Sequence, residues 1–236
     1  YIHALAAKGL RHDGRKLAEY RKITVIPNYI ENALGSSLVK IGGTQVLAGI
    51  SMAVGEPYPD SPNEGALMTG CELVPLASPA FEPGPPSEEA VEVARVVDRG
   101  IRESKAIDME ALCIEEGEKV WLVMIDLHVL DYAGNLFDAG TLAAISALLN
   151  TRMPKYEDGT IIRETNKKLP VRKKPVECTF AKIGNTIMLD PVLEEEKTMD
   201  ARVTFATTEK DELCAVQKGG IGSFKEKEIL DALDLA

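Results

Sequence analysis

Two blocks of alternating hydrophobic and polar residues, each followed by a helical pattern, make up most of this chain. The first block predicts strands over residues 23–30, 37–41, 44–53 and 66–76, with Gly42-Gly43 as a tight hairpin turn. Residues 119–130 are almost continuously hydrophobic. That run predicts a strand covered on both faces and makes Asp126 a candidate buried carboxylate.

The second block predicts strands over residues 176–183, 186–189, 201–208 and 213–217, with a hairpin turn at Gly184-Asn185, and then a helix over 224–233. Because strands followed by a helix occur twice, we expect an α+β fold with two pseudo-repeated halves. The expected halves are residues 1–152 and 153–236, packed as one globular unit.

The first helical pattern follows a stiff loop. Pro83, Pro85 and Pro86 restrict the backbone, and Ser87 can cap the helix that begins after it. Apolar residues at helical spacing form the expected buried face: Ala90, Val93, Ala94, Val97 and Ile101. Gly100 is unfavourable inside a helix, which indicates that another group approaches the backbone closely there.

Arg95, Arg99 and Arg102 lie on one side of this helix, within about 60° of arc. A row of guanidinium groups suits the phosphates of a nucleic-acid backbone. The pattern is also typical of a solvated helix face, in which Glu92 pairs with Arg95 and Asp98 with Arg102. The spacing alone favours the solvated face.

A second helix is predicted over residues 142–149, opened by Asp138-Ala139-Gly140-Thr141 and apolar on every side. The segment 150–175 that follows reads as a polar connector. It is strongly basic: Arg163, Lys167, Lys168, Arg172, Lys173 and Lys174. Such runs are most often solvated, although they can contact phosphates.

The net charge of −10 over 236 residues argues against nucleic-acid binding by the whole surface and restricts it to a local basic patch. No apolar run reaches transmembrane length and no signal peptide is recognisable, so a cytoplasmic protein is expected. Four separated cysteines and three scattered histidines give no ligand cluster, so no metal or cofactor is predicted. The cysteines are expected to be buried thiols.

Several stretches together resemble the RNase PH family. They are RHDGR at 11–15, GEPYPDSPNEG at 55–65, FEPGPP at 81–86, ARVVDRGIRES at 94–104 and LHVLDYAGNLFDAGTLAAISALL at 127–149. The likeness is greatest to the subunit type of archaeal exosomes that builds a hexameric ring without holding an active site. It implies the RNase PH fold, with pseudo-duplicated β-α-β-α units of the ribosomal protein S5 domain 2-like type.

The same resemblance implies partners. Such a ring contains three heterodimers with a catalytic RNase PH-like subunit and carries RNA-binding cap subunits. It degrades single-stranded RNA from the 3′ end with inorganic phosphate, releasing nucleoside diphosphates. Arg95 and Arg99 match positions that reach RNA in the neighbour's pocket, and Arg102 is the weaker candidate because Asp98 can neutralise it.

Departures from the active members imply a silent site in this chain. Active members place Gly, Ser or Thr and then an arginine at a helix start that binds phosphate, whereas Gly140 and Thr141 are followed here by Leu142. Asp200 matches the second of two catalytic aspartates, and nothing within 194–197 matches the first cleanly. A non-catalytic subunit is therefore expected. The open alternatives are an architectural subunit without RNA contact and an autonomous phosphorolytic exoribonuclease.

Overall fold

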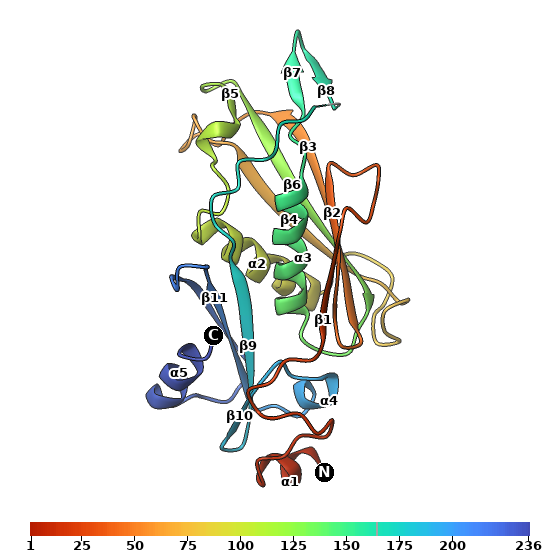
Figure 1. Cartoon of the computed structure of the whole chain (residues 1–236), viewed down its shortest axis with the longest axis vertical. Helices are drawn as coiled ribbons and strands as arrows, with labels where there is room; N and C mark the ends of the chain where they lie inside the picture. Colours follow the sequence, from red (N-terminus) through yellow and green to blue (C-terminus); the bar gives the residue numbers. More distant parts are fainter. Residues whose placement is uncertain (164) are drawn as a thin grey trace.

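Two β-sheets with two long helices between them form the body of the molecule (Figure 1). The computed structural model describes residues 1–163 and 165–236. The first sheet has the strand order β1 (Ile23–Pro27), β2 (Gly35–Ile41), β3 (Thr44–Gly55), β6 (Lys119–Asp131) and β4 (Ala66–Leu73), and β5 (Cys113–Glu115) pairs with the start of β6. All neighbours are antiparallel except β4 and β6.

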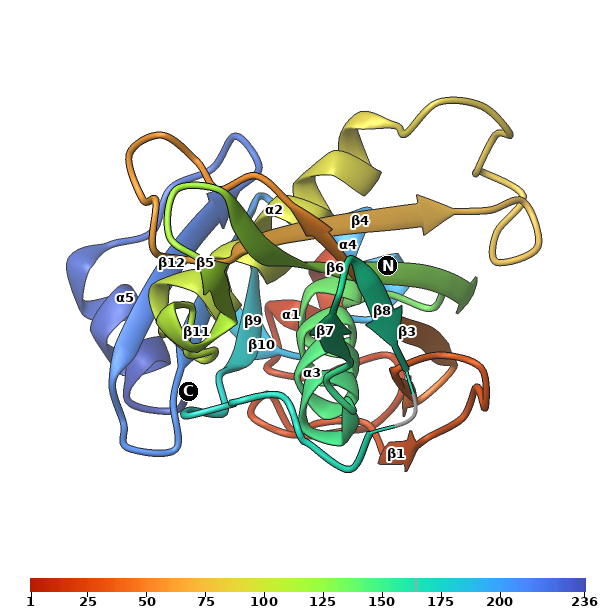
Figure 2. The same ribbon diagram turned by 90° about the horizontal axis from the view of Figure 1, so that it is seen from above.

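The second sheet has the order β10 (Thr186–Leu189), β9 (Val176–Ile183), β11 (Ala201–Thr207) and β12 (Leu213–Gly219). The helices α2 (Glu88–Glu103) and α3 (Leu136–Asn150) lie between this sheet and the first one, and both touch each sheet. Figure 2 shows the loop that precedes α2 standing away from the body. The remaining elements are short: α1 (Ile2–Ala6), the 3-10 turn Glu110–Leu112, β7 (Lys155–Glu157), β8 (Thr160–Ile162), α4 (Leu193–Glu196) and α5 (Glu226–Leu233).

The main hydrophobic core lies between the first sheet and the helices α2 and α3. A smaller cluster, with Phe180 and Phe205 in edge-to-face contact, packs against α5. None of the described helices combines the length and the apolar character needed to cross a bilayer.

The prediction that β6 is covered on both faces is wrong. Its residues alternate between fully buried and partly exposed, and Asp126 is exposed rather than buried. The helices cover one face of the first sheet only, so Asp126, His128 and Met68 lie on its outer face, where no described element covers them. The hydrophobic run of β6 therefore belongs to a strand with one buried face and one partly exposed face.

Several predicted boundaries also move. β1 ends at Pro27 because the chain turns at Asn28, which has a left-handed φ of 54°. β4 ends at Leu73 instead of 76, and the polar connector contains the β7–β8 hairpin. The boundary between halves at residue 152 stays a prediction; α3 ends at Asn150 and the second sheet begins at Val176.

Candidate functional site

The outer side of α2 carries two exposed arginines. Ser87 caps the helix as predicted, accepting a hydrogen bond of 3.2 Å from the backbone N–H of Ala90. Arg95 and Arg99 are exposed one turn apart, and neither forms an ion pair with any residue that the structure describes. Their charge is therefore available to a ligand.

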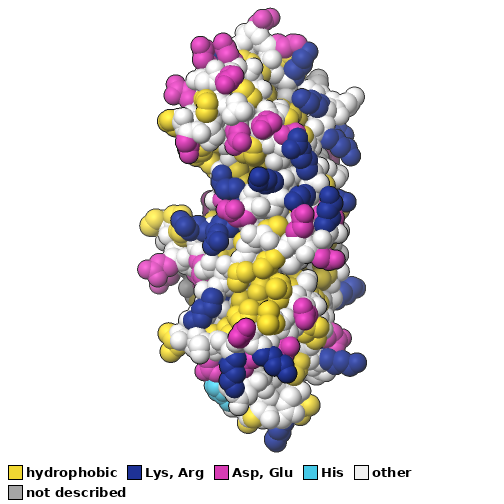
Figure 3. All heavy atoms as spheres, turned by 90° about the vertical axis from the view of Figure 1, so that its left-hand side faces the viewer, with side chains coloured by type: hydrophobic (Ala, Val, Ile, Leu, Met, Phe, Trp, Pro, Cys, Tyr) yellow, Lys and Arg dark blue, Asp and Glu magenta, His cyan; other side chains and the backbone are white. Residues whose placement is uncertain are grey.

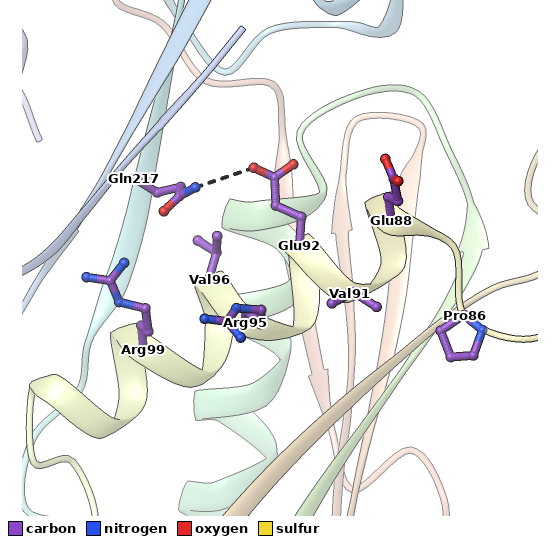
Figure 4. Close-up of a pocket in the computed structure, with 8 residues that line it drawn as sticks. All are labelled: Pro86, Glu88, Val91, Glu92, Arg95, Val96, Arg99 and Gln217. Atoms are coloured by element: carbon purple, nitrogen blue, oxygen red, sulfur yellow. Dashed lines mark hydrogen bonds between the residues drawn. The ribbon is translucent and has the colours of Figure 1, made fainter.

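Arg95 and Arg99 line an open groove of about 450 Å³ between α2 and the edge strand β12 (Figure 4). Val91 and Val96 give it an apolar wall, and Gln217 lines it from β12. The Gln217 amide donates only a long hydrogen bond of 3.5 Å to Glu92. Guanidinium groups beside apolar surface suit a chain of phosphates, sugars and bases better than they suit a small metabolite.

Arg102 lies in a different environment. Its Nε donates to Asp98 Oδ2 at 2.9 Å and its Nη2 donates to the carbonyl oxygen of Leu67 at 2.9 Å. The hydrogen bond to Asp98 raises the pKa of Arg102. The predicted Asp98–Arg102 pair is confirmed, whereas the predicted Glu92–Arg95 pair is wrong.

Glu92 instead forms an ion pair with Arg202 on β11. It is reached by Arg202 because the second sheet packs over this part of α2, which the sequence spacing did not reveal. As a consequence Arg95 is left without its expected partner.

A buried carboxylate explains Gly100. A Cβ at this position would come within 2.8 Å of Glu177 Oε1, so the close approach predicted from the glycine is confirmed. Glu177 is only 4 % exposed, and its Oε2 has no hydrogen-bond partner among the described residues. Burial, and secondarily the charge of Asp138, raises the pKa of Glu177 to about 8.

Replacing Glu177 with glutamine should change how stability depends on pH. A raised pKa means that the folded state keeps the proton while the unfolded chain ionises near the ordinary glutamate pKa of 4.5, so the wild type loses stability as the pH rises from about 5 to 8. We expect Glu177→Gln to remove a loss on the order of 4 kcal/mol over this window. Urea unfolding at several pH values measures the difference, with Glu116→Gln on the surface as the matched control. Parallel profiles for the wild type and Glu177→Gln would contradict the assignment.

The start of α3 is not where the sequence placed it. The helix begins at Leu136, after Asn135 in a left-handed conformation with φ of 62°. Gly140 and Thr141 therefore lie buried inside the helix, Gly140 against Val93 and Val97 of α2, and Leu142 comes directly after them. The expectation that these three residues form a helix start is wrong, because the Gly134-Asn135 turn begins the helix one turn earlier.

The true start of α3 already holds a carboxylate from the chain itself. Glu196 Oε1 accepts a hydrogen bond of 2.8 Å from the backbone N–H of Asn135, and Glu196 Oε2 accepts one of 2.7 Å from the hydroxyl of Tyr132. Negative groups are favourable at helix N-termini, where anions such as phosphate also bind. Burial raises the pKa of Glu196 to about 7.

Among the described residues, no free cation replaces the missing arginine at this helix start. Phe137 is the second residue of α3, and the guanidinium of Arg202 lies 4.4 Å from the centre of its ring. Arg202 is in turn paired with Glu92. The start of α3 thus offers an aromatic ring, a carboxylate and an arginine that is already neutralised.

Asp200 lies directly before β11, two residues from Arg202. It is exposed, and its Oδ2 accepts a hydrogen bond of 2.7 Å from the backbone N–H of Gly184, in the turn after β9. Thr179, which contacts the α3 residue Asp138, lies five residues earlier on β9, a separation of roughly 16 Å along the strand. The structure therefore does not bring Asp200 together with Gly140, Thr141 and Leu142.

A buried ionic cluster holds the RHDGR segment to the second half. Asp190, fully buried, accepts hydrogen bonds from Arg15, Arg21 and Asn135 at 2.7–2.9 Å. Burial alone would raise the pKa of Asp190, but the hydrogen bonds and charge of Arg21 bring it below its usual value. Arg11 pairs with the buried Glu195 nearby at 2.5 Å.

Comparison with known proteins agrees with the family resemblance. Residues 19–154 match the model of the 3′ exoribonuclease family, domain 1 (RNase_PH), and residues 174–236 match that of domain 2. The chain is 52 % identical to the exosome complex component Rrp42 of Methanothermobacter thermautotrophicus over 96 % of this chain and 85 % of that protein. It is 52 % identical to Rrp42 of Methanopyrus kandleri over 100 % of this chain and 90 % of that protein.

Solved structures show the same similarity in three dimensions. A chain of the Archaeoglobus fulgidus exosome with RNA bound to the active site superposes with a TM-score of 0.93 at 49 % identity, covering 100 % of this chain and 92 % of that one. Rice Rrp46 shares the fold alone, with a TM-score of 0.70 at 15 % identity, covering 95 % of this chain and 92 % of that one. The predicted α+β RNase PH fold is confirmed.

Proposed function

Since this chain belongs to the RNase PH family of 3′ exoribonucleases, we propose that it is a ring subunit of an exosome that degrades RNA from the 3′ end. In this proposal it forms a heterodimer with a catalytic RNase PH-like subunit, and three heterodimers close the ring. RNA-binding cap subunits complete the complex, which works in the cytoplasm. The chain supplies RNA contacts and shape, and its partner supplies the phosphorolytic chemistry.

One observation carries the proposal: Arg95 and Arg99 are exposed, lack a described ion-pair partner and line the same groove. Charge-assisted hydrogen bonds from guanidinium groups to phosphate are among the stronger polar contacts that a protein makes. A helix face that was merely solvated would be expected to carry the intrahelical pairs that its sequence allows. Arg102 has such a pair, and Arg95 does not.

The start of α3, which is occupied by the Glu196 carboxylate, supports a non-catalytic role. Phosphorolysis requires a bound phosphate and stabilisation of charge in the transition state. Glu196 occupies the N-terminal end of α3, and Phe137 in its first turn offers no donor. A second anion there would be repelled by the carboxylate whenever Glu196 is ionised.

The uncovered outer face of the first sheet supports assembly. Met68, Met124 and Leu122 are partly exposed on this face beside small residues such as Gly49 and Gly70. An apolar sheet face that no described part of the chain covers is typical of a surface buried against another subunit.

Co-purification followed by a degradation assay tests the proposal. The chain alone should release no nucleoside diphosphates from a 3′ RNA tail in phosphate buffer, whereas the complex with its partner should release them. Phosphate-dependent release by the isolated chain, abolished by Asp200→Asn, would establish the autonomous-enzyme alternative. Loss of assembly without loss of RNA retention in variants of Arg95 and Arg99 would favour the architectural alternative.

A further inference from the structure

The basic residues of this chain are concentrated beyond the arginine groove. Residues 152–174 contain eight Lys and Arg against three Asp and Glu, in a chain whose net charge is −10. Figure 3 shows Lys and Arg side chains gathered across the middle and along one edge of the face beside α2, with fewer acidic groups among them.

The connector that carries these residues is held against the C-terminal end of α2. The backbone N–H of Arg172 donates to the carbonyl oxygen of Ala106 at 2.6 Å, and Ile107 forms a β-bridge with Val171. Lys105, exposed at the end of α2, lies next to this junction and lines one pocket with Arg172. The basic connector therefore meets the C-terminal end of the helix that carries Arg95 and Arg99.

At its other end the connector places like charges opposite each other. Arg152 and Lys168 are direct partners in an antiparallel bridge, and the carbonyl oxygen of Lys167 accepts a hydrogen bond of 2.8 Å from Met153. Like charges directly opposite across a bridge are destabilising. The end of α3 nearby accounts for part of this charge, since cations are favourable at a helix C-terminus. That effect is confined to the last turn, so it does not account for Arg163.

Some cations in this region are neutralised within the protein. Arg172 pairs with Asp108 and Lys173 with Glu212. Within the part of the chain that the structure describes, a larger set forms no ion pair: Arg95, Arg99, Lys105, Arg152, Lys167 and Lys168. These six exposed side chains run from the groove, past the end of α2, to the end of α3.

We infer that this basic track, formed by Arg95, Arg99, Lys105, Lys168, Lys167 and Arg152, binds the part of a single-stranded RNA that lies outside the arginine groove. The inference rests on the proposed function, because the groove is taken to hold RNA. Spaced cations without base-reading groups bind a phosphate backbone irrespective of sequence. The track thus lengthens the RNA segment that the complex retains.

Binding of RNAs of two lengths to the assembled complex tests the track. The probes are labelled oligoadenylates, one of about four nucleotides that fills only the groove and one of about 25 nucleotides that also reaches the connector. We expect Lys167→Glu/Lys168→Glu to weaken binding of the long RNA by about tenfold or more, to reduce its salt slope by roughly 0.7 per lost contact, and to leave the short RNA unchanged. Lys8→Glu/Lys227→Glu, which makes the same charge change at exposed lysines away from the connector, should alter neither.

Each other outcome decides against the track. Equal weakening of both RNAs, or of neither, overturns it, as does a defect in ring assembly with RNA retention intact, which would make the connector a protein contact. Failure of the proposed function would give a different result. In that case Arg95→Glu/Arg99→Glu, which changes the groove itself, would leave binding of the short RNA unchanged.

Discussion

Replacing Arg95 and Arg99 together with glutamate is expected to weaken RNA binding by the assembled complex by about two orders of magnitude. Both guanidinium groups are exposed in one groove and unpaired within the described chain. A hydrogen bond to a charged group is worth about 1.5–3 kcal/mol, so two such losses amount to roughly 3 kcal/mol or more. Filter binding or fluorescence anisotropy at several salt concentrations measures it, and the salt slope should fall by about 0.7 for each lost phosphate contact.

Two controls separate RNA contact from general charge effects. Arg102→Gln should change RNA binding much less, because this guanidinium is already engaged by Asp98 and the carbonyl oxygen of Leu67. Lys8→Glu/Lys227→Glu carries the same change in net charge as the double arginine variant and should bind RNA normally. If the arginine variant assembled and bound RNA like the wild type, Arg95 and Arg99 would have no RNA role.

Asp190→Asn is expected to lower the free energy of unfolding by about 3 kcal/mol. The substitution keeps the shape of the side chain and tolerates the left-handed φ of 51° at this position, so it removes mainly the charge. Arg15 and Arg21, whose side chains are 10 % and 9 % exposed, would then lose the buried carboxylate that pairs with both of them. Breaking a buried ion pair from one side typically costs about 3–5 kcal/mol.

The loss should depend on pH in a defined direction. Because the pKa of Asp190 is lowered in the folded state, its stabilising effect is present above the unfolded pKa of about 3.8 and disappears as the pH falls through the folded value. Urea unfolding of wild type and variant should therefore differ at neutral pH and converge in acid. Asp13→Asn, which breaks a more exposed pair with Arg15, should cost less than about 1 kcal/mol. A similar small cost for Asp190→Asn would show that the buried cluster is not structurally important.

The strands and the arginine helix could be predicted because their signals are local. Alternation defined most strands, Ser87 marked the start of α2, and Gly100 correctly indicated a close approach. The outer face of β6 could not be read in this way. A strand whose second face is left uncovered can have the same hydrophobic run as one covered by its own helices.

The site at the start of α3 was placed one turn late for a physical reason. Gly140-Thr141 matched a family pattern, but the local signal for the helix start was the Gly134-Asn135 turn followed by Asp138 in the first turn. Glu196 was then seen only as one of three consecutive glutamates. Its contact with Asn135 joins residues 61 positions apart, which no spacing rule predicts.

Because the carboxylate at the start of α3 belongs to the chain itself, the stability of this helix start does not depend on a dissolved anion. A site that binds dissolved phosphate is stabilised by an amount that grows as the phosphate concentration rises above the dissociation constant. Glu196 is carried by the chain itself, so its local concentration is fixed by the fold and does not vary with the cell's phosphate supply. The stability of this helix start should therefore be the same at low and at high phosphate. A site that binds dissolved phosphate would instead be less stable at low phosphate and more stable at high phosphate.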